Sequence, residues 1–190
     1  YLKDKDKFRV PDEIIPIEIG GHSIEEDGCL RPTTDLEGLA GLKLAFDENG
    51  TVTAGTSSPL TDGAAATLVC SLDYANANGL TPMARIAGIA VSGCKPETMG
   101  LGPIFSSRKA LSRAGIKAKD LDVVEINEAF ATQSIASIRD LELDTAKVNI
   151  DGGAIAIGHP LGATGARITG KAAQLLKRQG GRYALSTQCI

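Results

Sequence analysis

Residues 152–167 read GGAIAIGHPLGATGAR, in which five glycines surround one histidine, His159. Glycine lets the backbone approach a ligand closely, and Pro160 favours an extended backbone at the residue before it. We therefore interpret the stretch as a rigid turn that presents an imidazole just before a helix. It is a weaker candidate for a phosphate-binding loop, because it has neither the Gly-Lys-Ser/Thr ending nor the GxGxxG spacing. A tight strand-to-helix turn with a structural histidine is the alternative.

Strand and helix patterns alternate on both sides of this turn. Helical periodicity covers residues 166–179, which end at Gly180-Gly181, and residues 106–115. A further helix is expected after Phe130, with core contacts from Phe130, Ile135 and Ile138. Apolar runs predict strands at residues 51–53, 64–71, 84–92, 122–126, 148–150 and 183–190. This alternation predicts an α/β fold with a mixed five-stranded sheet layered with helices.

The start of the chain has a different character. Up to about residue 45 it contains a charged opening, a Gly20-Gly21 turn and an acidic run at residues 25–27, with weak periodicity throughout. We expect a loop-rich segment or linker here, without a core of its own.

Composition excludes several classes of protein. The 190 residues carry a formal charge of −3, and no dense Lys/Arg run is present, so nucleic acid is not an expected partner. No apolar stretch approaches the roughly 20 residues that a membrane span needs. The four cysteines, Cys29, Cys70, Cys94 and Cys189, have no metal-binding spacing, which favours a reducing compartment and no metal. We expect a cytoplasmic protein, or one of an organellar matrix in a eukaryote.

Four stretches in order resemble the motifs of thiolases. The histidine stretch resembles the family's Gly-His motif, residues 53–65 its substrate-side loop, residues 125–131 its Asn-Glu-Ala-Phe motif, and Cys189-Ile190 the start of Cys-Ile-Gly-Gly-Gly. The resemblance covers essentially the whole chain. Several motifs in the right order are far more specific than any single one.

The resemblance implies a domain division and a subclass. Residues 1–48 are expected to be a remnant of the loop domain and linker, and residues 49–190 a thiolase-like C-terminal domain truncated after the final Cys-Ile. The Thr-Ser-Ser-Pro-Leu run and the stretch at residues 31–34 are closer to the thiolases of fatty acid β-oxidation than to those that form acetoacetyl-CoA.

The resemblance also implies a catalytic set. His159 is expected to activate a nucleophilic cysteine and to donate to the thioester oxygen, while Cys189 exchanges the proton at the alpha carbon. Asn127 is expected to hold a water that forms an oxyanion site with His159. On the residues alone, a small buried hydrophobe in a strand is the favoured role of Cys189, and a helix N-cap is the alternative role of Asn127. The simplest role of Glu128 is structural, near the positive end of a helix dipole.

A second set faces the substrate. Ser58 matches a serine that contacts the pantetheine of CoA, and Arg31 matches an arginine that lies against the adenine. Phe130 is expected to line the pocket or the core, and Gly158 to let the backbone approach the substrate. For Ser58 and Arg31, a solvated loop residue is the alternative. CoA is a substrate here, so no cofactor is expected.

One difference from complete thiolases, the missing nucleophilic cysteine, affects the activity that we expect of this chain. In thiolases a first half, related to this one by duplication, carries the nucleophilic cysteine, and Cys29, Cys70 and Cys94 lie outside any such motif. The full-length protein is therefore expected to be an acyltransferase that cleaves 3-ketoacyl-CoA or runs the reverse condensation, and the chain alone to be inactive. Expected partners are acyl-CoA, the missing half and further copies of the chain. A stand-alone, non-catalytic binding or structural module is the alternative.

Overall fold

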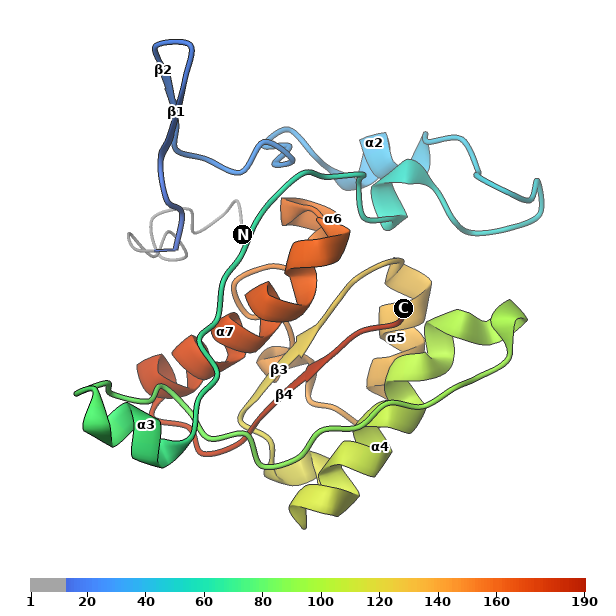
Figure 1. The fold of residues 1–190 in the computed structure, drawn as a ribbon. Coiled ribbons are helices and arrows are strands. Elements are labelled where there is room, and N and C mark those ends of the chain that lie inside the picture. The colour runs from blue at the N-terminus through green and yellow to red at the C-terminus, as the bar shows by residue number, and fades with distance from the viewer. Residues whose placement is uncertain (1–12) are drawn as a thin grey trace.

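The structure is a computed structural model that describes residues 13–190, so the charged opening of the chain lies outside it. Figure 1 shows an α/β domain around a parallel sheet, in which β3 (Val123–Ile126) pairs with β4 (Ala184–Thr187). One long helix, α7 (Leu161–Gln179), packs on one face of this sheet. The other face is covered by α4 (Gly102–Ala114) and α5 (Ala131–Asp140). The predicted α/β class is confirmed.

The sheet is buried on both faces, as is usual for parallel strands. All four residues of β3 are buried. Because alternate residues of a strand point to opposite faces, Val124 and Ile126 join Leu185 in the apolar core, whereas Val123 and Glu125 face α7. Glu125, the polar residue of β3, therefore lies beneath α7, the helix that follows His159.

The predicted helix ends are found at glycines. Gly115 ends α4 and Gly180 ends α7, both with positive φ, in the left-handed conformation that glycine adopts without a steric penalty. The start of α7 was predicted too late. It begins at Leu161, directly after Pro160, because the glycines in its first turns do not interrupt helical hydrogen bonding.

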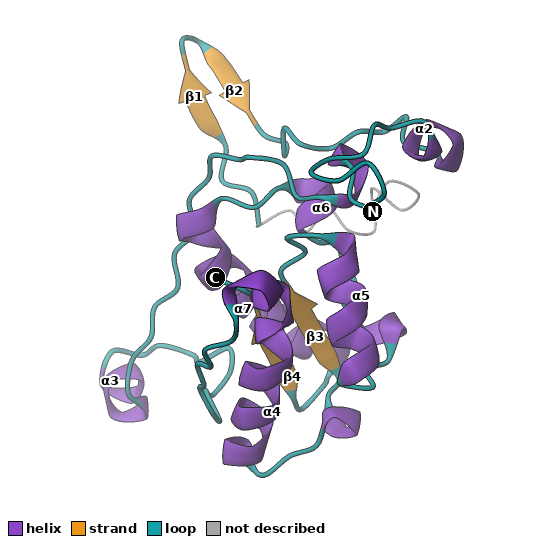
Figure 2. Cartoon of the chain, turned by 90° about the vertical axis from the view of Figure 1, so that its right-hand side faces the viewer, coloured by secondary structure: helices purple, strands orange, loops and turns teal. Residues whose placement is uncertain are grey.

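The remaining elements are short. Figure 2 shows the hairpin of β1 (Ile17–Ile19) and β2 (His22–Ile24) projecting from the domain. The short α-helices are α2 (Leu36–Ala40), α3 (Leu72–Ala77) and α6 (Ala154–Ile157). The 3-10 helices are Ala54–Thr56, Pro96–Leu101, Ala118–Asp120 and Thr145–Lys147. Among residues 13–190, no helix is both long and apolar enough to cross a membrane.

The N-terminal segment forms no core. None of residues 13–52 is buried, which agrees with the expectation of a loop-rich segment. Its contacts with the C-terminal part of the chain include the ion pair between Glu13 and Lys171 at 2.6 Å and the edge-on contact of the Phe46 and Phe130 rings.

The expected five strands are not confirmed. Residues 64–71 and 84–92 were predicted to be strands, the first of them buried, but both runs are largely exposed, with Leu68 at 73% and Val91 at 79%. Within the described part of the chain, residues 64–70 and 84–92 make no backbone–backbone hydrogen bonds. A β-prone run needs a neighbouring strand to become part of a sheet, and neither run has one here.

Smaller predictions fail for local reasons. Residues 51–53 and 148–150 contribute only isolated bridges, Leu44 to Thr53 and Val124 to Val148. The second run ends at Asn149, whose φ of 46° turns the backbone out of the strand. Ile135 is not a core residue, since 46% of its surface is exposed on the outer side of α5, while Ile138 does pack against the core.

Candidate active site

His159 is held by its backbone in a turn that only glycine permits at residue 158. Its backbone N–H donates to Thr61 Oγ1 at 3.1 Å, and that hydroxyl donates to the carbonyl of Pro59 at 2.8 Å. Gly158 has a φ of 95°, and a Cβ there would lie 2.5 Å from Thr61 Oγ1. We call residues 152–160 the histidine turn. The contact with Thr61 fixes the backbone position from which the imidazole projects.

Two side chains fix the orientation and tautomer of the imidazole. Thr164 Oγ1, in the first turn of α7, lies 2.7 Å from His159 Nδ1 and donates its own proton to the carbonyl of Pro160 at 3.0 Å. It must therefore accept from Nδ1–H. The side-chain amide of Asn127 donates to Nε2 at 3.3 Å. The lone pair of Nε2 is thus the basic position, at the end of β3.

Asn127 is fully buried directly after β3. Its backbone N–H donates to the carbonyl of Thr187, which places it beside the end of β4. Its Oδ1 is buried and has no partner among the described residues. A buried carbonyl oxygen without a partner is costly, so this atom is suited to accept a hydrogen bond from a water or ligand. Asn127 is not a helix N-cap, since Phe130 occupies that position in α5.

A polar bridge joins the end of β3 to the histidine turn. Asn149 accepts from the N–H of Ile126 at 2.8 Å, and its amide donates to the carbonyl of Ile126 and to Glu128 Oε1. The second oxygen of Glu128 accepts from the N–H of Ile155 at 3.1 Å, at the start of α6. The structural role expected of Glu128 is therefore found at α6. This bridge sets the position of Asn127 relative to His159.

Electrostatics keep the imidazole uncharged. Burial lowers the pKa of His159 below its usual 6.5, and the guanidinium of Arg167 lowers it further. Because a histidine is neutral above its pKa, His159 is neutral at pH 7, and its unprotonated Nε2 accepts from the amide of Asn127. A neutral imidazole with its lone pair at Nε2 can take a proton from a thiol, so the arrangement is suited to general base chemistry.

Comparison with known proteins agrees with this geometry. The profile of the thiolase C-terminal domain matches residues 80–190, and that of the thiolase N-terminal domain matches residues 3–73. The 3-ketoacyl-CoA thiolase of Marinobacter nauticus is 51% identical over 96% of this chain and 49% of its own length. The chain belongs to the thiolase family.

Solved structures agree. Human mitochondrial 3-ketoacyl-CoA thiolase superposes with a TM-score of 0.91 and 43% identity, over 99% of this chain and 48% of the human chain. The Bacillus anthracis acetyl-CoA acetyltransferase gives a TM-score of 0.90 at 39% identity, over 100% of this chain and 49% of its own. This thiolase chain therefore spans about half the length of the relatives it matches.

Cys189 lies at the same edge of the thiolase sheet as Asn127. In the parallel register Ile126 faces Thr187, so Asn127 and Cys189 both follow the carboxyl ends of paired strands. The thiol is half-buried, and burial raises its pKa above the ordinary value. A protonated thiol suits a proton donor. Among the described residues no hydrogen bond connects Cys189 with His159.

Backbone pairing brings two substrate-side residues to this edge. The N–H of Ser58 donates to the carbonyl of Ala129 at 3.0 Å, and Ser57 forms a bridge with Phe130. The ring of Phe130 meets Phe46 edge-on, with 6.4 Å between centroids. The structure thus places Ser58 and Phe130 beside the segment that follows Asn127, and their contact with a substrate stays a prediction.

No contact among the described residues links Arg31 to the site, and its role toward CoA stays a prediction. Arg31 is exposed on the N-terminal segment, and within residues 13–190 its side chain makes no hydrogen bond or ion pair. Two residues that hold His159, Thr61 at its backbone and Thr164 at its imidazole, were not predicted from the sequence. The signal for Thr164 was its place in the first turn of the helix after His159, four residues beyond Pro160, where a threonine hydroxyl can bond back to a carbonyl.

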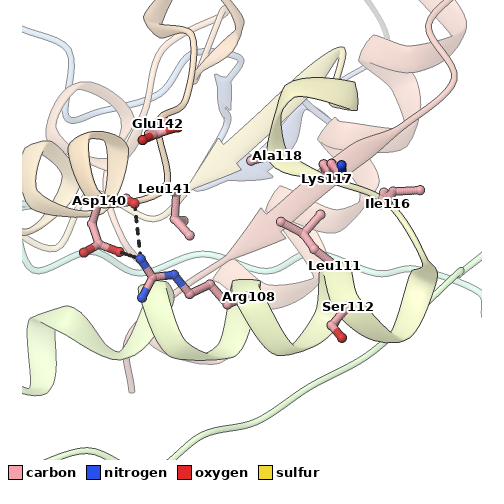
Figure 3. A pocket seen from close by; sticks show the side chains of 9 residues that line it. All are labelled: Arg108, Leu111, Ser112, Ile116, Lys117, Ala118, Asp140, Leu141 and Glu142. Carbon is pink, nitrogen blue, oxygen red and sulfur yellow. Dashed lines mark hydrogen bonds and ion pairs between the residues drawn. The ribbon is translucent and has the colours of Figure 1, made fainter.

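A surface pocket of about 460 Å³ lies away from the histidine, between α4 and the end of α5 (Figure 3). Arg108 crosses it to form an ion pair with Asp140 at 2.7 Å, and Leu111 lines its floor. Ala118 on its wall precedes β3, whereas Asn127 follows the opposite end of that strand. This pocket is therefore separate from the histidine site.

Proposed function

We propose that this chain forms one part of an acyltransferase that moves acyl groups between CoA thioesters, by thiolytic cleavage of 3-ketoacyl-CoA or by the reverse condensation. The observation that carries the proposal is the neutral His159, whose basic Nε2 faces the amide of Asn127 at the sheet edge where Cys189 also lies. Relatives named 3-ketoacyl-CoA thiolase and acetyl-CoA acetyltransferase support it, as does the human relative crystallised with CoA.

In the proposed cleavage, His159 Nε2 takes the proton of a nucleophilic cysteine in the other half of the protein. The thiolate attacks the 3-keto carbon, the bond between C2 and C3 breaks, and Cys189 gives its proton to C2 to complete acetyl-CoA. Cys189 then takes the proton of the incoming CoA thiol, the CoA sulfur takes the acyl group from the nucleophile, and the proton on His159 goes back to the nucleophile as its sulfur is released. A water held by Asn127 Oδ1, together with His159, stabilises the thioester enolate.

We also propose the metabolic role of this reaction, the residues that face CoA and the cellular compartment. The Thr-Ser-Ser-Pro-Leu run favours degradation of fatty acids by β-oxidation, with Ser58, Phe130, Gly158 and, from the N-terminal segment, Arg31 on the CoA side. The reaction needs no cofactor or metal beyond its substrates. Four free cysteines are compatible with a reducing compartment, which is the cytoplasm or an organellar matrix.

The first prediction tests the contribution of the other half. The 190-residue chain alone is expected to show no thiolysis of acetoacetyl-CoA, because His159 and Cys189 have no acylated nucleophile to serve. The chain extended to the full length of its relatives is expected to turn over, as followed by the loss of acetoacetyl-CoA absorbance. The control is the extended protein with its nucleophilic cysteine replaced by alanine. Thiolysis by the chain alone would overturn this assignment and would favour a site complete within these residues.

The second prediction concerns assembly. Residues 64–71 and 84–92 expose Leu68, Val69, Ile89 and Val91, and apolar surface of this extent usually marks an interface. We propose that these runs are covered by the missing half and that copies of the chain associate. Light scattering is expected to show a mass above 19.7 kDa that rises with concentration. Leu68→Lys together with Val91→Lys is expected to lower that mass. A strictly monomeric chain at high concentration contradicts the proposal.

A further inference from the structure

Each side chain that holds the imidazole has a charged residue next to it on the same face of its element. Thr164 is followed by Arg167 one helical turn later on α7, and residues three apart on a helix are neighbours. Asn127 is preceded by Glu125 on β3, and residues two apart on a strand share a face. Since α7 packs on β3, Arg167 and Glu125 occupy one layer beneath His159.

This layer is buried, and two of its polar atoms are unpaired. Glu125 is 1% exposed, and its Oε1 makes no hydrogen bond; Arg167 Nε is also buried without a partner within residues 13–190. Glu125 and Arg167 attract each other, but no hydrogen bond or ion pair joins them. Burial raises the pKa of Glu125 to about 7 despite that attraction, so at and below neutral pH much of the carboxyl is uncharged.

The other charges near the layer are already engaged or more distant. Lys171, the next cation on α7, pairs with Asp151 at 2.5 Å and with Glu13 at 2.6 Å, and Arg178 binds both oxygens of Asp151. Glu128 is committed to Asn149 and Ile155. The groups that face the layer are therefore Glu125 and Glu128 from β3 and its exit, Lys171 from α7, Asp151 before α6, and Asp27 and Glu13 from the N-terminal segment.

We propose that Arg167 is a positioning residue that keeps His159 in its neutral, basic form from one turn along α7. The proposal rests on the base role proposed above. Glu125, Asp27, Glu128 and Glu13 attract Arg167, but no hydrogen bond or ion pair joins it to Glu125, and its positive charge disfavours an imidazolium at His159. In the proposed reaction, an imidazolium formed beside Arg167 gives its proton up readily, which suits a group that must return it. Burial contributes most to the lowered pKa of His159, and the charge of Arg167 acts in the same direction.

The third prediction is a histidine titration of the 190-residue chain by NMR. The sequence has only two histidines, and the other, His22, lies on the exposed β2 strand, where it serves as an internal reference. Arg167→Gln is expected to raise the pKa of His159 by about half a unit to one unit, a three- to tenfold change in proton affinity.

Three further variants separate charge from packing. Arg167→Lys keeps the charge and is expected to leave the pKa of His159 close to that of the unsubstituted chain, and below that of Arg167→Gln. Glu125→Gln disturbs the same buried pair but retains the positive charge of Arg167. The pKa of His159 is therefore expected to stay the same or fall. Lys171→Gln, one turn further along α7, is expected to have a much smaller effect.

The results distinguish the possible outcomes. An equal rise in Arg167→Gln and Glu125→Gln would show that packing of the β3–α7 layer, not charge, sets the protonation of His159, and would overturn the proposal. No shift in Arg167→Gln also overturns it. If Arg167→Gln does not fold, the comparison of Arg167→Lys with Glu125→Gln decides, because a rise in either contradicts a charge effect. The titration needs no turnover, so the charge effect and the proposed acyltransferase activity can fail separately.

Discussion

Replacement of His159 by alanine in the full-length protein is expected to lower thiolysis of acetoacetyl-CoA by about two to four orders of magnitude. The variant loses the base at Nε2 and one of the two groups that bind the enolate oxygen. Acyl-enzyme formation and overall turnover are measured separately, in single-turnover and steady-state assays. Both are expected to fall, because the nucleophile is no longer activated.

Two variants sharpen this test. Thr164→Val keeps the imidazole but removes the acceptor for Nδ1–H, so its loss is expected to be smaller than that of His159→Ala. Cys189→Ala is expected to impair turnover while acyl-enzyme formation stays partly intact, because its proton is needed after the nucleophile has attacked. Full turnover in Cys189→Ala rules out its proposed role. Near-normal acyl-enzyme formation in His159→Ala rules out that of the histidine.

Local signals in the sequence predicted those parts of the fold that depend on local physics. Gly115 and Gly180 end helices because a left-handed residue caps them, and this preference is readable without tertiary contacts. The strand at residues 122–126 was readable because Val123, Val124 and Ile126 are β-branched apolar residues, which favour strands. Residues 64–71 are also apolar, but the strand predicted there is wrong. Strand pairing depends on a neighbouring strand, which a sequence window does not contain.

The site residues also divide into those that residue type and spacing reveal and those that only tertiary contacts reveal. The glycine-rich histidine turn and Asn127 were found because their residue types and spacing are distinctive. Thr61 and Thr164 were missed because a threonine in a loop or a first helical turn is common, and only contact with the imidazole gives it a role. Arg31, placed at the substrate by resemblance, is not brought to the site by any contact in the described residues, since it lies on a segment without a core.

The bridge between β3 and the histidine turn leads to the second large prediction. Gly153→Ala is expected to destabilise the chain by about 2 to 4 kcal/mol, because a Cβ there would lie 2.1 Å from Glu128 Cδ and 2.2 Å from its Oε1. The backbone of Gly153 is extended, with a φ of −120°, so alanine adds no backbone strain. The whole cost comes from displacement of Glu128, which loses its bonds to Asn149 and Ile155.

Denaturant unfolding of the 190-residue chain measures this cost, and Gly162→Ala is the matched control. A Cβ at Gly162 meets nothing within 4 Å, in the first turn of α7, so that change is expected to be neutral or to stabilise by up to about 1 kcal/mol. Glu128→Ala opens the space that a Cβ at residue 153 needs. In Gly153→Ala with Glu128→Ala, the loss is therefore expected to be smaller than the sum of the two single losses. Strict additivity, or a cost for Gly153→Ala no larger than that for Gly162→Ala, would show that Glu128 does not hold the histidine turn in place.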